Sequence, residues 1–200
     1  MVAPSGGLDT VLCDVGDVIV RFDRSVAAGI ERECGLPAGA LLRAALKSPV
    51  GRLAMTGQIS FEQWRGETAA VVGSAAVDRW LAYHGELERD VVYQLRMVKS
   101  SGRQVVLSSN ATRRLWDDLA FHGVNELADA VWCSADIGLA KPDPACFHYA
   151  ARHSGFELHR TLYVDDTPSW VEAGQALGLT GHVFTTADHL REDLKALELL

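Results

Sequence analysis

Short apolar runs alternate with longer amphipathic stretches along most of the chain. Five such runs are typical of buried β-strands, and we expect strands at residues 10–13, 104–107, 130–133, 161–164 and 182–184. Helical patterns separate the last four of them. Because strands that alternate with helices usually pair in parallel, the pattern predicts an α/β fold with a doubly wound parallel sheet.

The helices are clearest in the second half of the chain. Leu87, Val91, Leu95 and Val98 recur at spacings of four, four and three, which places them on one helix face that stops at Gly102. Pro just after the start and Gly after the end mark two further helices. These two are expected over about residues 143–154 and 167–177, and two others over about residues 112–121 and 188–200.

The segment from about residue 24 to residue 84 has no convincing strand and predicts several amphipathic helices. We expect these helices to break at residues 35–37, at residues 49–51 and at Gly57. Ser60 and Gln63 form a capping box that starts one of them. Trp64 and Trp80 are interpreted as its apolar core, so the first strand is followed by an inserted helical unit.

Composition narrows the classes of partner. Of the 200 residues, 48% are hydrophobic and 22% charged, which is typical of a soluble globular chain and excludes extensive disorder. Lys and Arg number 19 against 26 Asp and Glu, for a formal charge of −7. This acidity argues against nucleic acid or an anionic membrane as partner. The negative net charge does not exclude a phosphorylated substrate, because one well-placed cation reverses the local electrostatic field.

The absence of two sequence features predicts where in the cell the protein is located. No stretch approaches the roughly 18–20 apolar residues of a membrane span, and residues 1–10 show no signal-peptide pattern. The four cysteines are scattered without a CxxC pair, and we expect four buried, reduced thiols: Cys13, Cys34, Cys133 and Cys146. The chain is therefore expected to be cytoplasmic.

Polar residues follow three of the five predicted strands. In doubly wound sheets ligands bind beyond the carboxyl ends of the strands, where this chain has Asp14, residues 108–110 (Ser-Ser-Asn) and the pair Asp165-Asp166. Lys141 precedes the helix after the third strand. Each residue alone is typical of a turn, but three crowded carboxylates repel unless a divalent cation or a lysine compensates them. Together they suggest a Mg²⁺ site that accepts a phosphate.

In chain order these residues resemble the four motifs of the haloacid dehalogenase superfamily of hydrolases. Asp14 matches the nucleophile, Ser109 the second-motif hydroxyl, Lys141 the third-motif base, and Asp165-Asp166 the acidic fourth motif. The insert resembles the helical cap of the subclass with small sugar-phosphate phosphatases and β-phosphoglucomutase. The first motif is similar to that of a branch with α-glucose-1-phosphate phosphatases. The resemblance implies a core at 1–22 and 86–200 and a cap at 23–85.

The resemblance also implies roles for these residues. Asp14 would attack phosphorus to form an aspartyl-phosphate. Mg²⁺ would lie on Asp14, the Gly16 carbonyl and Asp166, with Asp165 helping directly or through water. The remaining phosphate-binding groups would be Gly16, Ser109, Asn110 and Lys141.

Two positions depart from the family pattern. Phosphatases of the superfamily usually carry a second Asp two residues after the nucleophile as general acid and base, and this chain has Gly16 there. Asp17 either replaces that acid or is a turn residue. Trp170 stands where fourth motifs often carry Asn or Asp, so a bulky indole is expected near the site.

Three functions remain open. The first is a Mg²⁺-dependent phosphatase of a small phosphorylated metabolite, such as a sugar phosphate, and a homodimer is compatible with it. The second is a metal-independent haloacid dehalogenase, which needs no second Asp but also lacks the paired acids seen at Asp165-Asp166. The third is a catalytically weak protein that binds a phosphorylated ligand, which Gly16 and Trp170 motivate.

Overall fold

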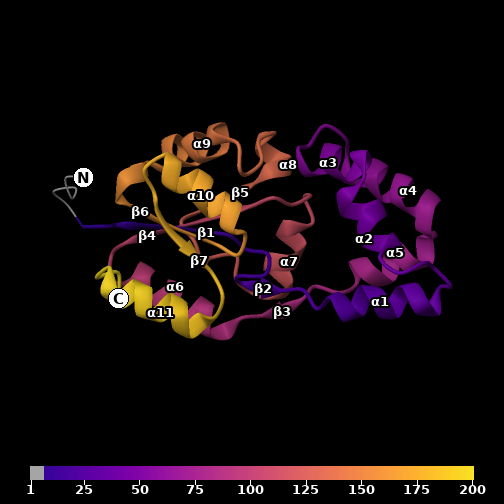
Figure 1. Cartoon of the computed structure of the whole chain (residues 1–200), viewed down its shortest axis with the longest axis horizontal. Helices are drawn as coiled ribbons and strands as arrows, with labels where there is room; N and C mark the ends of the chain where they lie inside the picture. Colours follow the sequence, from indigo (N-terminus) through magenta and orange to yellow (C-terminus); the bar gives the residue numbers. More distant parts are fainter. Residues whose placement is uncertain (1–6) are drawn as a thin grey trace.

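A five-stranded parallel sheet lies at the centre of the computed structural model, which describes residues 7–200 (Figure 1). The strand order is β5-β4-β1-β6-β7, so the predicted doubly wound α/β fold is confirmed. Residues 1–6, which the signal-peptide expectation concerned, lie outside the described residues. The strands are β1 (Thr10–Cys13), β4 (Gln104–Ser109), β5 (Ala130–Cys133), β6 (Thr161–Asp165) and β7 (Thr180–Val183).

The register of the central strands aligns their carboxyl ends. Cys13, the last residue of β1, pairs with Leu107 of β4 on one side and with Val164 of β6 on the other. The residues that follow therefore leave the sheet at one edge. The last strand runs from residue 180 to residue 183, so it begins two residues before the expected 182–184 and ends one residue earlier, and Phe184 lies beyond it.

Alternate residues of each strand pack into two apolar layers, as the period of two requires. Val11 and Cys13 belong to the layer under α6 (Arg89–Ser100) and α11 (Ala187–Ala196). Leu12 belongs to the layer under α9 (Pro144–Ser154) and α10 (Pro168–Ala176). The two helix pairs lie on opposite faces of the sheet in Figure 1.

Shorter elements complete the core. They are α7 (Leu115–Phe121), α8 (Ser134–Ile137), the 3-10 helix η2 (Leu158–Arg160) and the two-residue strands β2 (Val20–Arg21) and β3 (Glu86–Leu87). Leu87 was expected on the helix face of α6 but lies in β3, where it pairs with Val20. Asp143 caps α9 by accepting a hydrogen bond from the Ala145 N–H, as predicted.

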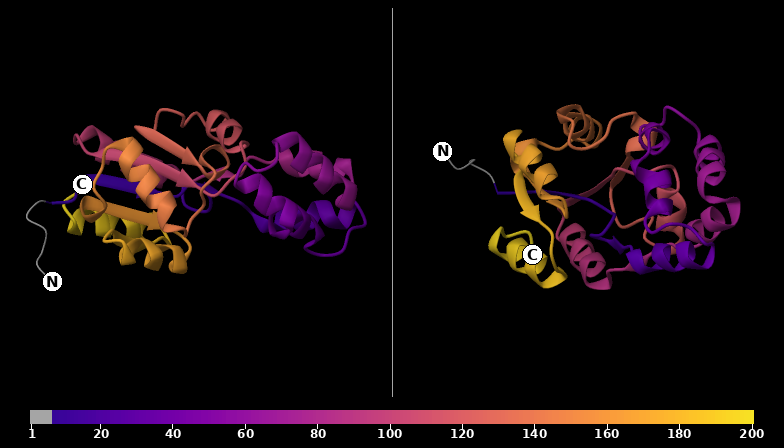
Figure 2. Two further views of the ribbon diagram at one scale, coloured as in Figure 1. Left: turned by 90° about the horizontal axis from the view of Figure 1, so that it is seen from above. Right: turned by 45° about the vertical axis from the view of Figure 1, so that its right-hand side comes forward.

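Between β2 and β3 the chain forms a second, wholly helical group, here called the helical insert. Its elements are α1 (Arg24–Glu33), α2 (Ala40–Leu42), the π-helix η1 (Arg43–Lys47), α3 (Pro49–Met55), α4 (Phe61–Val72) and α5 (Ser74–Leu81). The strands β2 and β3 join it to the core (Figure 1), and the arrows of the sheet strands point toward it in the left view of Figure 2.

One expected helix break in the insert was misplaced by one or two residues. Residues 49–51 begin α3 instead of ending a helix, because Ser48 accepts a hydrogen bond from the Gly51 N–H and Pro49 fits the first turn. The capping hydrogen bond from the Gln63 N–H to Ser60 is present. Trp64 is buried, and its indole donates to the Ala45 carbonyl over 2.8 Å.

Three of the four cysteines are buried free thiols, namely Cys13, Cys133 and Cys146. The expectation of four buried thiols was wrong for Cys34, which follows the exposed end of α1. Among residues 7–200, no helix combines the length and the apolarity that crossing a membrane requires.

Candidate active site

The chain turns sharply after β1 and brings its first carboxylate to the edge of the sheet. Asp14 is 5% exposed, and its N–H donates to the Val164 carbonyl, which continues the ladder with β6 by one residue. Three residues later Asp17 adopts a left-handed conformation, with φ of 55°. This turn places the carboxylate of Asp14 in front of the neighbouring strands.

Lys141 lies at the centre of the polar cluster. Its ammonium is 2.9 Å from Asp14 Oδ1, 2.8 Å from Asp165 Oδ2 and 2.9 Å from the Ser108 carbonyl oxygen, so all three of its protons have an acceptor. The side chain is almost fully buried. Burial disfavours the ammonium, but the two carboxylates outweigh it and raise the pKa of Lys141. The lysine is therefore a fixed positive charge.

Asn110 holds the backbone of this lysine. Its side-chain amide donates to the Lys141 carbonyl oxygen over 2.7 Å, and its oxygen accepts from the Lys141 N–H over 2.9 Å. The side chain that sequence reasoning gave to the substrate is thus engaged in positioning Lys141. Ser109 is 7% exposed and lines the cavity beside it.

Asp165 is directed toward Lys141 by three donors. One oxygen accepts from Lys141 and from the Tyr163 hydroxyl, at 2.8 and 2.5 Å, and the other accepts from the Thr167 N–H over 2.9 Å. The residue is fully buried. The protein thus occupies most of the acceptor sites of this carboxylate, which forms the buried counter-ion of the lysine.

Asp14 and Asp166 carry the negative charge that the protein leaves incompletely compensated. Burial, opposed by Lys141 and aided by Asp165, raises the pKa of Asp14 to about 6. Partial burial and the nearby carboxylates of Asp165 and Asp17 raise the pKa of Asp166. Ligand oxygens of Asp14, Asp165 and Asp166 lie within 4.8 Å of one another. Such a group of hard oxygen donors fits Mg²⁺.

The turn residue Asp17 uses one oxygen to accept a hydrogen bond from the Phe22 N–H over 2.9 Å. This contact closes the turn between β1 and β2, in agreement with the structural interpretation of Asp17. The residue also lines the cavity in front of Asp14. Gly16, one residue earlier, has open space where a side chain would begin.

Trp170 covers the lysine from α10. The Lys141 ammonium lies 5.1 Å from the centroid of the indole ring, within the range of a cation–π contact. The expected indole is therefore next to the site, and it forms part of the cavity wall.

Two connected cavities lie between the core and the helical insert. The inner one, of about 330 Å³, is lined by Asp14, Gly16, Asp17, Ser109, Asp166 and Trp170, among others. The outer one, of about 340 Å³, is lined by residues of the insert and of α7, including Lys47, Trp64, Trp80, Tyr83, Arg114 and Asp118. Both share Phe22, Leu46 and Asp118, so one ligand can extend from the carboxylates to the insert.

Sequence reasoning missed the polar group between the two cavities. Asp118 accepts hydrogen bonds from His84 over 2.7 Å and lies 3.3 Å from the Arg114 guanidinium. Burial raises the pKa of Asp118 in spite of these partners. The four-residue spacing of Arg114 and Asp118 would have predicted that these two side chains lie on one helix face. The contact with His84 could not be predicted in this way, because His84 is 34 residues from Asp118.

Comparison with known proteins places the chain in a family. Residues 8–178 match the family of haloacid dehalogenase-like hydrolases. The chain is similar to the D-ribitol-5-phosphate phosphatase of Bacteroides thetaiotaomicron, with 25% identity over 183 residues, which cover 86% of this chain and 89% of the relative.

Two solved structures share the fold. A HAD family enzyme from Bacteroides thetaiotaomicron, crystallised with magnesium and inorganic phosphate, superposes with a TM-score of 0.76 at 18% identity, over 90% of this chain and 96% of that one. A predicted HAD-like hydrolase from Porphyromonas gingivalis gives a TM-score of 0.80 at 20% identity, over 96% and 98% of the two chains.

Proposed function

This chain belongs to the haloacid dehalogenase-like hydrolase family, and from that premise we propose that it is a Mg²⁺-dependent phosphatase of a small phosphorylated metabolite. The proposal rests on one observation: Asp14 and Asp166 face a cavity while Lys141 lies 2.9 Å behind Asp14. A carboxylate that is buried beside a fixed ammonium is suited to attack an anionic phosphorus centre, because the ammonium offsets their repulsion.

The residues present fit the metal. Asp14 and Asp166 would hold Mg²⁺ directly with the Gly16 carbonyl, and Asp165 would support them through Lys141 instead of acting as a direct ligand. Bound there, the ion would offset the charge of the attacking carboxylate and of the phosphate. The carboxylate of Asp14 forms the bond to phosphorus, and the ester oxygen leaves with the electron pair of the broken bond and takes a proton from water. A water molecule then attacks the phosphorus of the aspartyl-phosphate, which restores the Asp14 carboxylate and releases inorganic phosphate. Ser109 orients a phosphoryl oxygen, and Lys141 offsets the negative charge from behind Asp14.

The helical insert would act as a cap that selects the rest of the substrate. The outer cavity combines aromatic side chains, such as Trp80 and Tyr83, with Asp118, whose carboxylate accepts hydrogen bonds. Such a lining supports a sugar or polyol phosphate, the class that the similar ribitol-phosphate enzyme uses. An anomeric sugar phosphate, such as α-glucose 1-phosphate, suits the site best, because its leaving oxygen departs with less need for a general acid.

A phosphate-ester panel tests this function. We expect phosphate release in Mg²⁺ and its loss in EDTA, with anomeric sugar phosphates among the better substrates. Equal turnover in EDTA would contradict the metal assignment. Halide release from a 2-haloacid without metal would establish the dehalogenase instead, and binding of phosphate esters without any turnover would establish the ligand-binding alternative.

The absence of an acid at position 16 gives a separate prediction. Wild-type rates should fall steeply as the pKa of the leaving alcohol rises, because Asp17 spends one oxygen on the turn. Gly16→Asp has room for its side chain, and we expect it to raise the rate on alkyl phosphates by about 10²-fold with little change on an acyl phosphate.

Gly16→Asn is the matched control, since it adds a side chain of the same size without an acid. Its rates should not rise on any ester. An equal gain in Gly16→Asn and Gly16→Asp, or rates that do not depend on the leaving group, would disprove this interpretation of the turn.

A further inference from the structure

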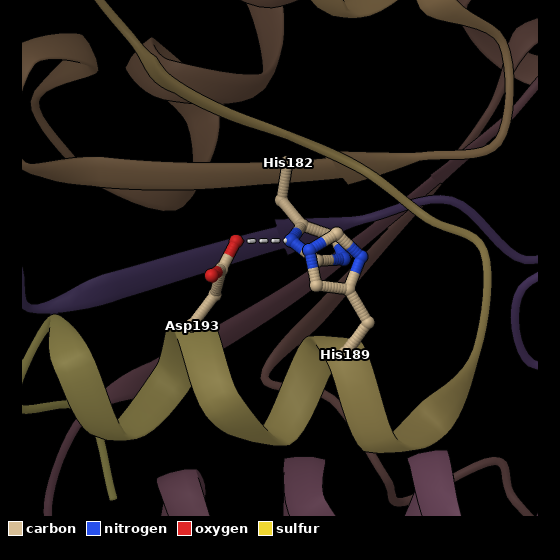
Figure 3. Close-up of side chains that lie close together, drawn as sticks. All are labelled: His182, His189 and Asp193. Carbon is tan, nitrogen blue, oxygen red and sulfur yellow. Dashed lines mark hydrogen bonds and ion pairs between the residues drawn. The ribbon is translucent and has the colours of Figure 1, made fainter.

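A second cluster of metal-binding side chains lies on the edge strand of the sheet. His182 belongs to β7, and His189 and Asp193 belong to α11, which follows β7 after a short loop (Figure 3). None of the three residues lines either cavity of the active site. The cluster is therefore a feature that the proposed phosphatase reaction does not use.

The three side chains converge from two elements. His189 and Asp193 are four residues apart, so they lie on one face of α11. Ligand atoms of all three residues lie within 4.8 Å of one another. His182 Nδ1 is 2.6 Å from Asp193 Oδ2, and the two imidazole rings are 4.8 Å apart between centroids. Asp193 thus occupies Nδ1 of His182, and Nε2 is the nitrogen of that ring that can bind an ion.

One nitrogen of this cluster is buried without a partner. His182 is 2% exposed, and its Nε2 has no hydrogen-bond partner within residues 7–200. Its other nitrogen faces Asp193, which fixes the proton at Nδ1 and leaves a lone pair on Nε2. A buried lone pair without a partner carries a desolvation cost that a bound ligand would offset.

The other two side chains of the cluster are oriented and accessible. His189 Nδ1 lies 3.1 Å from the Thr185 hydroxyl, which leaves its Nε2 free to coordinate. His189 is exposed, and the Asp193 side chain is 42% exposed, so an ion has a path from solvent. A carboxylate that hydrogen-bonds to a histidine is also the usual partner that orients a metal-binding imidazole.

We propose that His182 Nε2 and His189 Nε2 form a second metal site, with Asp193 as the carboxylate that orients His182, and that this site prefers Zn²⁺ and similar transition-metal ions over Mg²⁺. Imidazole nitrogens are among the donors that Zn²⁺ prefers, whereas Mg²⁺ prefers oxygen alone. The bound ion connects α11 to the last strand of the sheet. It therefore stabilises the carboxyl-terminal end of the core and takes no part in phosphate transfer.

Metal titration of the full chain tests this site. The background is Cys34→Ser, which removes the exposed thiol as a competing ligand, with Mg²⁺ in excess. Zn²⁺ binding is measured against a chromogenic chelator and by thermal unfolding. The test variants are His189→Ala and Asp193→Asn, and His148→Ala, an exposed histidine on α9, is the matched control.

We expect His189→Ala to abolish one Zn²⁺-binding equivalent and the Zn²⁺-induced rise in Tm, and Asp193→Asn to weaken Zn²⁺ binding more than about 10-fold, while His148→Ala changes neither. Co²⁺ should give visible absorption bands that His189→Ala removes. Zn²⁺ binding that is the same in His189→Ala, or a wild-type Tm that does not respond to Zn²⁺, would overturn the proposal. Phosphatase activity in Mg²⁺ should stay unchanged in His189→Ala, so failure of this site leaves the proposed function intact.

Discussion

Asp14→Asn is expected to abolish phosphate release, with a loss of between about 10⁴- and about 10⁶-fold in kcat, the range for removing a residue that acts as part of a hydrolytic unit. The amide has the size of the carboxylate, and its oxygen still accepts from Lys141, which donates over 2.9 Å in the wild type. It lacks the negative charge and the nucleophilicity that formation of an aspartyl-phosphate requires. The rate is measured with the preferred ester in excess Mg²⁺.

Thermal unfolding in EDTA is the control for Asp14→Asn. Burial raises the pKa of Asp14 to about 6, so at neutral pH the folded protein bears the cost of a desolvated charge, and the variant should unfold at the same temperature or higher. Because the folded state binds this proton more tightly than the unfolded state, wild type gains stability relative to the variant as the pH falls through 6 toward 4. Substantial turnover by the folded variant would exclude Asp14 as nucleophile.

The strands and the polar edge of the sheet were predictable because they depend on local patterns. Short apolar runs and the polar residues that follow them are encoded within a few positions. The strands β2 and β3 were not predictable, because two residues carry no periodicity and Val20 pairs with Leu87 across the whole helical insert.

The different roles of Asp165 and Asp166 could not be predicted from the sequence either. Adjacent residues at the end of a strand point in different directions, and the sequence does not say which one faces a lysine. Here Asp165 accepts from Lys141 and Tyr163, whereas Asp166 faces the cavity. The role of Asn110 as a clamp on the Lys141 backbone likewise depends on contacts between residues 31 positions apart.

Lys141→Met is the second substitution with a large expected effect, because it removes the cation between two buried carboxylates. Breaking a buried ion pair by removing one partner costs about 3–5 kcal/mol. For a chain of this size that corresponds to a fall in Tm of roughly 6–20 °C. Methionine keeps most of the volume of the lysine side chain, and Asn110 can still hold the backbone of residue 141. The fall in Tm therefore reports the lost charge more than lost packing. Thermal unfolding in EDTA measures it, and turnover should be lost as well.

The double variant Lys141→Met with Asp165→Asn separates stability from catalysis. It removes one of the two carboxylates that the lysine compensates, and the amide can still pair with Tyr163 and Thr167, so most of the lost Tm should return. Turnover should not return, since no ammonium then offsets the repulsion between Asp14 and phosphate. Mg²⁺ should also raise the Tm of the single variant more than that of wild type, because the ion would neutralise Asp14 where the lysine no longer does. A double variant as active as wild type would show that Asp165 and Lys141 stabilise the fold and take no part in catalysis.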